Sequence, residues 1–401
     1  MATHDYVIDN STGANVRTDI NNVLQAILTN NSSGSAPSTT AAYMLWADTS
    51  NNLLKMRNSA NDGWIDLRTL TGGLSSSADA TINSLTVGKG ANSVAGNTVL
   101  GESALDASVT GANNTAIGKN ALTTLTSGLQ CTAVGQAAGA LHTTGASLTA
   151  VGHNAAGSNT TSNNITAIGQ NALLSNTTGG ENTAVGSTTL DANTTGQANT
   201  AIGYGALGAN TTANNNTACG YAALFNNTTG TENTAVGLNS LLANTTGVRN
   251  TAVGSGALDT NTTASDNTAV GFQALEFTTT GERNCAFGNN ALRANTTANN
   301  NSAFGEQALE ANTTGTRLTA VGEAALHANT TASDNTAVGL YALLSNTTGS
   351  YNTAVGTYAL DANTTNNNST AIGYAALTQS TGMNLTAVGA YSLDANTTGQ
   401  E

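Results

Sequence analysis

Short apolar stretches recur along this chain at a fixed spacing, and asparagine, threonine and glycine separate them. From residue 98 onward the unit is close to N-T-A-V-G-x-x-A-L-x-A-N-T-T-G-x-x. The apolar residue before the glycine, called the marker below, recurs every 17 residues with one last step of 16, which gives 18 coils. Glycine follows the marker in all 18 units. A fixed period of this kind indicates a repeat architecture.

The unit favours short strands rather than helices. A helix needs apolar residues three and four positions apart over 10–12 residues, and the recurring glycines leave no room for that pattern. Two short strands and two turns fit each coil. The sequence therefore predicts an all-β fold in which residues 99–401 form a parallel β-solenoid, or β-roll, of 17-residue coils.

Because successive side chains of a strand point to opposite faces, the marker and the alanine before it lie on different faces. We expect the marker and the leucine five residues later to point into the roll, and the alanine column to face another chain, because a small outward residue permits close approach of a backbone. The alternative is an alanine packed within its own roll. The expected core is Val185, Leu190, Ile202, Leu207, Val236, Leu241, Val253, Leu258, Val270 and Leu275, and the expected contact between chains is Ala184, Ala201, Ala235, Ala252 and Ala269.

The second half of the unit carries turn chemistry. The glycine after each marker is expected to have a positive φ or to be tightly packed, which only glycine tolerates at little cost. Asparagines at the same place in successive coils can form side-chain amide ladders. The turn glycines selected on this basis are Gly186, Gly203, Gly237, Gly254 and Gly271.

Residues 1–73 differ from the repeats and predict a small α+β attachment domain. Apolar residues from Val16 to Leu28 follow helical spacing. Residues 42–47, 52–58 and 63–69 then predict a three-stranded meander, with Trp46 and Trp64 as its core. Residues 74–98 form a glycine- and serine-rich neck before the solenoid. So short a domain gains stability from oligomerisation.

Composition excludes several partners. The formal net charge is −13 and only 8% of residues are charged, which argues against binding to nucleic acid or to an anionic membrane. No apolar run approaches a membrane span, and the N-terminus does not resemble a signal peptide, so we expect no membrane insertion. Cys131, Cys219 and Cys285 occupy three different repeat positions and are interpreted as small apolar substitutions.

No catalytic or metal-binding constellation is visible, so we expect neither an enzyme nor a cofactor. The four histidines are scattered. Seven acids follow the buried-leucine position, and they are interpreted as solubilising charge rather than as a cation site. Aromatic residues form a second stripe two or three residues after the marker, and exposed aromatics can stack on sugars. The candidates for surface binding are Tyr204, Tyr221 and Tyr374.

Two stretches resemble known families. The run HDYVIDNSTGANVRTDINNVLQAILTNNSSGSAPSTTAAYMLWADTSNNLLKMRN and the neck ATINSLTVGKG resemble tail-fibre proteins of tailed phages, especially marine and cyanobacterial ones. The repeat A-(V/I)-G-x-x-A-L resembles the β-roll heads of trimeric autotransporter adhesins, although those heads favour a shorter coil. The resemblance implies a homotrimer located in a virion. Its residues 1–73 would bind a tail or adaptor protein, and its shaft would reach toward a host glycan or protein.

Two alternative functions stay open. One is a bacterial surface adhesin of the autotransporter type, and the other is a solenoid that binds ice or another crystal surface through threonine. The last residues, Thr-Thr-Gly-Gln-Glu, lie in mid-repeat. Because solenoids normally need a cap, we expect the product to continue beyond Glu401 or another protein to cover this end.

Overall fold

Two units make up the computed structural model of this chain, residues 1–82 and residues 83–401. The boundary between them falls inside the predicted neck. The structure describes residues 16–18, 20–21, 32–37, 42–69, 79–82, 85–380 and 382–396.

The first unit contains the predicted meander. Strands β1 (Leu45–Asp48), β2 (Leu53–Arg57) and β3 (Trp64–Thr69) form an antiparallel sheet in that order, and β4 (Ala80–Ile82) follows. Residues 16–18 and 20–21 are helical, within the helix expected from the sequence, and the rest of that helix lies outside the described residues.

The two tryptophans meet on this sheet, as predicted. The ring centroids of Trp46 and Trp64 are 5.1 Å apart, and Trp46 is buried. Asp48 closes the turn after β1, where it accepts hydrogen bonds from the hydroxyl of Ser50 at 2.8 Å and the amide of Asn51 at 2.9 Å. Desolvation alone would raise the pKa of Asp48, but these hydrogen bonds outweigh it and lower the pKa to about 2.

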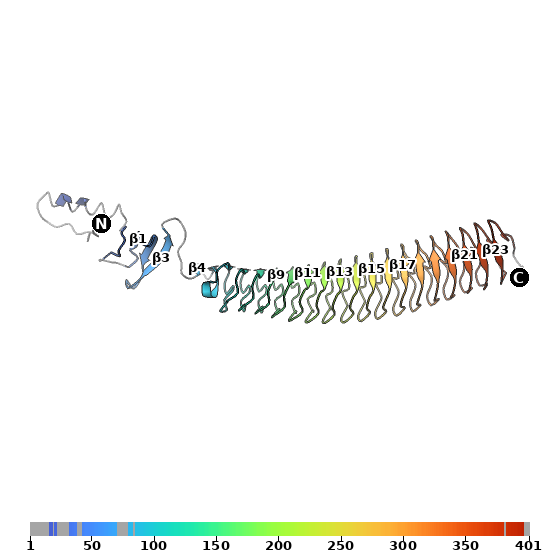
Figure 1. Ribbon diagram of the computed structural model, residues 1–401, viewed down its shortest axis with the longest axis horizontal. Coiled ribbons are helices and arrows are strands. Elements are labelled where there is room, and N and C mark those ends of the chain that lie inside the picture. The colour runs from blue at the N-terminus through green and yellow to red at the C-terminus, as the bar shows by residue number, and fades with distance from the viewer. Residues whose placement is uncertain are drawn as a thin grey trace. The chain divides into compact units, whose positions relative to one another are not determined.

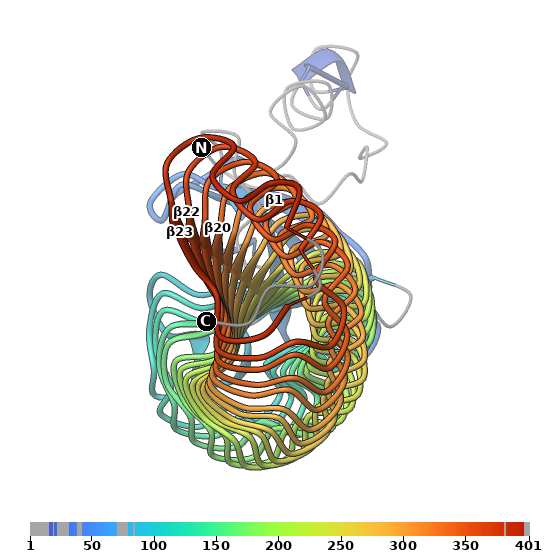
Figure 2. The same cartoon turned by 90° about the vertical axis from the view of Figure 1, so that its right-hand side faces the viewer.

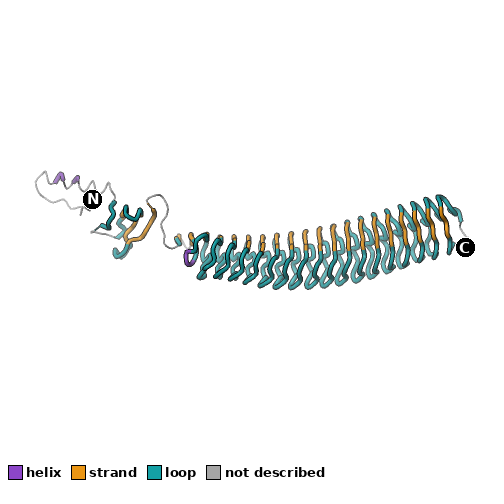
Figure 3. Tube along the Cα trace, viewed as in Figure 1, coloured by secondary structure: helices purple, strands orange, loops and turns teal. Residues whose placement is uncertain are grey.

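The second unit is a parallel β-solenoid, which confirms the predicted fold class. One strand per coil pairs in register with the strand of the next coil, so that Val185 lies beside Ile202 and Ala184 beside Ala201. Figure 1 shows the strands following one another along the unit, and Figure 3 shows them aligned on one side with turns forming the rest of each coil. Successive coils are rotated relative to one another, as the view along the unit shows (Figure 2).

Eighteen strands, from β6 to β23, form this ladder among the described residues. Their bounds are β6 (Thr98–Leu100), β7 (Thr115–Ile117), β8 (Thr132–Val134), β9 (Leu148–Val151), β10 (Ile165–Ile168), β11 (Thr183–Val185), β12 (Thr200–Ile202), β13 (Thr217–Cys219), β14 (Thr234–Val236), β15 (Thr251–Val253), β16 (Thr268–Val270), β17 (Cys285–Phe287), β18 (Ser302–Phe304), β19 (Thr319–Val321), β20 (Thr336–Val338), β21 (Thr353–Val355), β22 (Thr370–Ile372) and β23 (Thr386–Val388).

The prediction of two strands per coil is wrong. Each strand has only three or four residues, and the remaining residues of the coil form turns. Leucines five residues after the marker contribute to these turns, since Leu241 has φ 52° and Leu258 has φ 51°. A left-handed leucine costs roughly 1–2 kcal/mol, and burying its side chain, worth about 1.5–3 kcal/mol, offsets that cost.

The assignment of the two strand faces is also wrong. The alanine before each marker points into the roll, and the marker points outward, so Ile202 is 42% exposed and Val236 is 37% exposed. The predicted alternation of the two faces is therefore confirmed, but the face predicted to point inward points outward. The interior holds two alanines, one leucine and two asparagines per coil, and this leaves only methyl-sized space beneath the strand. Fully buried side chains include Ala184, Ala201, Ala235, Ala252 and Ala269, which therefore line no contact between chains, whereas the markers Val185, Val253 and Val270 are partly exposed.

The expected leucine core is confirmed, and buried asparagines complete it. Leu190, Leu207, Leu241, Leu258 and Leu275 are all fully buried. In one asparagine ladder, eight residues after the marker, each side-chain amide donates to the side-chain oxygen of the preceding coil. Such bonds join Asn210 to Asn193, Asn227 to Asn210, Asn244 to Asn227 and Asn261 to Asn244 at 2.8–3.1 Å.

A second asparagine ladder lies just before the strands. The backbone N–H of Asn250 donates to Oδ1 of Asn233 at 2.9 Å, and Nδ2 of Asn250 donates to the carbonyl of Ala264 at 2.8 Å. Both ladders satisfy polar groups that the narrow interior removes from water. They confirm the predicted amide ladders.

Apart from Gly389 in the last coil, the glycine after each marker meets both predicted conditions. In Gly237 φ is +134°, and a Cβ there would lie 2.6 Å from the carbonyl oxygen of Gly254 in the next coil. The same conflict with the next glycine occurs at Gly186, Gly203, Gly254 and Gly271. Close stacking of the coils therefore depends on the absence of a side chain at this position.

Residues 85–97 cap the first coil, where the sequence predicts only the end of a neck. Strand β5 (Leu85–Gly88) pairs antiparallel with β6, and the 3-10 turn η1 (Ala91–Ser93) follows. Nδ2 of Asn92 donates to the carbonyl of Val109 at 2.9 Å. This hairpin covers the first edge of the parallel sheet and protects it from pairing with another chain.

Replacing Gly237 by alanine should destabilise the solenoid by more than about 2 kcal/mol, because the new Cβ meets backbone that cannot move away and the φ is unfavourable. Gly180→Ala is the matched control, since a Cβ there would lie 3.4 Å from its nearest neighbour. Thermal unfolding followed by circular dichroism compares the two. Equal midpoints would contradict the stacking described here.

Asn244→Leu should lower the free energy of unfolding, because it leaves Oδ1 of Asn227 without its donor and removes one of the two acceptors of Nδ2 of Asn261. Each buried polar group left unpaired costs about 1–3 kcal/mol. Urea denaturation measures the loss, with Asn289→Ala at an exposed position as the control. A leucine variant as stable as the parent would show that the ladder adds nothing.

Candidate functional site

The outward face of the solenoid sheet carries two rows of side chains, one mostly of threonine and one apolar. The apolar row consists of the markers, and several of them are well exposed, among them Ile168, Ile372 and Phe304 at 38–41%. Phe287 and Phe304 stack with centroids 5.2 Å apart. We call this set the outer apolar row: Leu100, Ile117, Val134, Val151, Ile168, Val185, Ile202, Cys219, Val236, Val253, Val270, Phe287, Phe304, Val321, Val338, Val355, Ile372 and Val388.

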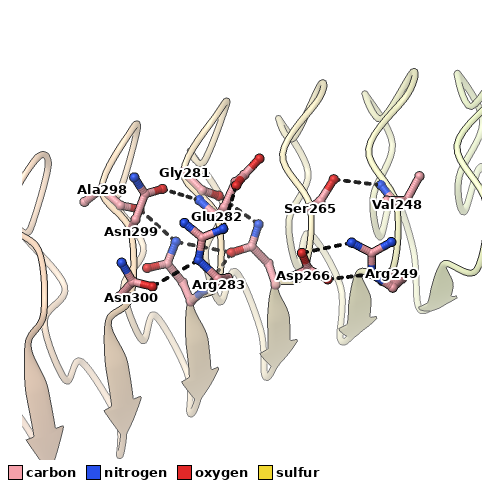
Figure 4. A network of polar contacts seen from close by, with 12 residues as sticks. Val248, Arg249, Ser265, Asp266, Gly281, Glu282, Arg283, Ala298, Asn299 and Asn300 are labelled. Carbon is pink, nitrogen blue, oxygen red and sulfur yellow. Dashed lines mark hydrogen bonds and ion pairs between the residues drawn. The ribbon is translucent and has the colours of Figure 1, made fainter.

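No charged residue occupies either outward row of strands β6–β23. The charges of the solenoid lie on the turns instead, where some pair between neighbouring coils. Arg249 contacts Asp266 at 2.7 Å, and Arg317 contacts Asp334 at 2.6 Å (Figure 4 shows the first pair). The hydrogen bond from Arg249 lowers the pKa of Asp266. The distribution leaves a long, uncharged, partly apolar face.

The three cysteines take different repeat positions, and two of them lie on this face. Cys219 is exposed in the outer apolar row, and Cys285 is half-buried in the threonine row. Cys131 is buried, and its backbone N–H joins the second asparagine ladder by donating to Oδ1 of Asn114 at 2.9 Å. Burial raises the pKa of the Cys131 thiol. All three are free.

The structure brings two of the three candidate tyrosines together. The rings of Tyr204 and Tyr221 stack with centroids 5.4 Å apart and an interplanar angle of 14°. Tyr374 lies elsewhere, in edge contact with Tyr358 at 6.2 Å and with Tyr391 at 5.2 Å. Sequence reasoning grouped the three by repeat position, but contact depends on whether neighbouring coils both carry an aromatic residue.

A cavity of about 630 Å³ adjoins the Tyr204–Tyr221 stack. We call it the aromatic groove, and it spans four successive coils. Phe225 also contributes to it; this residue follows a buried leucine, is 40% exposed and is not among the candidates from the sequence. The groove is lined by Thr188, Asp191, Ala192, Tyr204, Gly208, Ala209, Tyr221, Ala222, Phe225, Asn239 and Leu242.

Most of the acids that follow the buried leucines are half-buried rather than fully solvated, and Asp106 is the exposed exception. Desolvation raises the pKa of Asp191, Asp259 and Asp361. Oδ1 of Asp361 is buried with no hydrogen-bond partner. Within the described residues, no group of three or more potential ligands could hold a metal ion.

One histidine replaces an asparagine in the first ladder. His142 is buried, its Nε2 lies 2.8 Å from the carbonyl of Gly145, and its Nδ1 lies 2.9 Å from Nδ2 of Asn159. This geometry fits a neutral ring that donates from Nε2 and accepts at Nδ1. Burial lowers the pKa of His142. His142 therefore has a structural role in the ladder. Within the described coils, its hydrogen-bond partners include no nucleophile.

No family model, curated protein or solved structure matches this chain. None of the helices in the described part of the chain has the length and apolarity to cross a membrane. The two surfaces of the solenoid that could carry a function are the outer apolar row and the aromatic groove.

Asp361→Asn should raise the melting temperature at pH 7 by a small amount, on the order of one degree. The folded state raises the pKa of Asp361 above its ordinary value of 3.8, so ionisation disfavours folding at neutral pH, and this penalty disappears as the pH falls below 3.8. The advantage of the variant should therefore vanish near pH 3.

Asp334→Asn is the matched control with the opposite sign. The hydrogen bond from Arg317 lowers the pKa of Asp334, so this carboxylate stabilises the fold at neutral pH, and its contribution is lost as the pH falls. Calorimetry at pH 7 and pH 3 compares the two variants. An identical pH response would contradict the assignment of a desolvated carboxyl at residue 361.

Proposed function

We propose that this chain is the structural subunit of a fibre, in which the solenoid is the shaft and copies of the chain associate through the outer apolar row. Within that class, the proposal is a trimeric tail fibre of a tailed phage. Residues 1–73 would attach it to the virion, and the shaft would extend toward the host surface. The main observation that supports this proposal is the uncharged outward face that runs through strands β6–β23.

Three arguments support self-association. Isolated exposed apolar side chains are ordinary, but an unbroken apolar row along a sheet indicates an interaction surface. All the charges of the solenoid avoid the two outward rows. A second copy also has the same coil spacing, about 4.8 Å, so its apolar residues stay in register over the whole shaft, which an unrelated surface would not achieve.

The assignment to tail fibres has a different support. It rests on the resemblance of residues 4–58 and 80–90 to the starts of such fibres, and on a uniform repeat that provides length without a visible catalytic constellation. The trimeric state is the one that both resemblances imply.

Light scattering on the intact chain should give three times the chain mass of 39.8 kDa. Val236→Lys combined with Val253→Lys places two charges in the outer apolar row and should produce folded monomers. Leu238→Lys is the control, since Leu238 is 50% exposed but lies outside the row, and it should leave the trimer intact.

The cysteines report the same interface by position. In the native trimer a maleimide should label Cys219 and Cys285 slowly, whereas the double-lysine variant should expose both. Cys131 stays protected in either case because it is buried within its own coil. A wild-type monomer whose Cys219 reacts at once would overturn the proposal.

One observation favours a second function, binding to ice or another crystal surface. The outward face places a threonine row beside the outer apolar row at a regular spacing. A monomeric chain that shows thermal hysteresis would support this alternative over the fibre.

A further inference from the structure

The aromatic groove is a local departure from the repeat rather than a feature of every coil. Its aromatic residues stand two and six positions after the marker, on either side of a buried alanine–leucine pair. Tyr204, Tyr221 and Phe225 are 54%, 56% and 40% exposed. Three aromatic rings exposed side by side form a local patch rather than isolated exposed side chains, and such a patch indicates an interaction site.

Two glycines open the hollow. Gly208 occupies the position at which neighbouring coils carry Asp191 and Phe225, and Gly205 occupies a position with φ +64°. A Cβ on Gly208 would lie 3.0 Å from Cε2 of Phe225, so the ring of Phe225 leans over the space that a side chain would fill. The coil between Asp191 and Phe225 therefore lacks a side chain at this one position, beside Tyr204.

Polar groups are few and placed at the ends. Asp191 and Thr188 come from the first of the four coils, and Asn239 comes from the last. Asp191 is the one charged residue that lines the groove. Its half-buried carboxyl has lost part of its hydration, so donors from a ligand would be favourable there. A groove with aromatic walls and a few hydrogen-bonding groups is typical of a small-molecule site.

We propose that the aromatic groove binds a neutral oligosaccharide of hexopyranose units, with sugar rings lying against Tyr204, Tyr221 and Phe225. The apolar C–H face of a pyranose presents partial positive charge to the negative face of an aromatic ring. Its hydroxyls then bond to Asp191, Thr188 and Asn239.

Size and charge select this ligand over others. Four coils span about 14 Å along the axis, since coils are spaced about 4.8 Å apart. That length matches a di- or trisaccharide and exceeds an ammonium head group, the other usual partner of aromatic residues beside a carboxylate. The carboxylate of Asp191 and the net charge of −13 disfavour acidic sugars. No member of the outer apolar row lines the groove, so this proposal and the fibre proposal fail separately.

Saturation-transfer NMR and calorimetry on the intact chain test the proposal with cellobiose, lactose, maltose and chitobiose as probes. At least one disaccharide should bind. Gly208→Leu should weaken it at least tenfold by filling the groove. Leucine already occupies the equivalent position in other coils, as Leu174, Leu242 and Leu344, so the variant should fold normally. Tyr221→Ala should weaken binding similarly by removing one ring.

Tyr374→Ala is the matched control, because Tyr374 has the same repeat position as Tyr204 and Tyr221 but lies outside the groove. It should leave the affinity unchanged. Two results would overturn the proposal: no transfer to any of the four disaccharides, or binding that Gly208→Leu does not weaken. Binding of tetramethylammonium without any disaccharide would also overturn it and would identify a cation site instead.

Discussion

The structure of the solenoid depends on backbones that lie directly over one another, coil on coil. At the glycine after each marker except the last, a single Cβ would come within about 2.6 Å of the next carbonyl oxygen, as at Gly237. Such close stacking leaves a narrow interior, and most polar groups inside it find partners in their own coil or in the coils above and below. The asparagine ladders provide those partners, and alanine and leucine fill the remaining space. The 17-residue period is therefore a condition of the fold.

This constraint also explains which parts of the structure the sequence could predict. The period, the parallel register, the turn glycines and the amide ladders all follow from residues that recur in columns, and so does the meander around Trp46 and Trp64. The phase of the strand does not follow, because a three-residue alternation fits equally well with either face inward. One signal in the sequence favours the observed phase: the markers share their face with a threonine row, and polar, β-branched residues suit the outer surface of a sheet.

The candidate sites were less predictable than the fold. Tyr204 and Tyr221 were identified by their repeat position, but the groove beside them depends on the absence of a side chain at Gly208 and on Phe225 at a different position. Likewise, the outer apolar row became visible only once the alanines proved to be buried. Because the fold is fixed by the inward positions, the outward positions are free to carry recognition. The apolar row gives the shaft a continuous surface for association, and local exceptions to the repeat give it individual sites.

Amide hydrogen exchange resolved to single residues tests the stacked-coil account most directly. The N–H of Gly237 donates to the carbonyl of Cys219 in the preceding coil at 2.8 Å, and the N–H of Asn250 donates to the side chain of Asn233. The account predicts slow exchange at these two positions of every interior coil, repeating each 17 residues, with fast exchange at the exposed residue after each glycine. Uniformly fast exchange, or protection with a helical period of three to four residues, would contradict it.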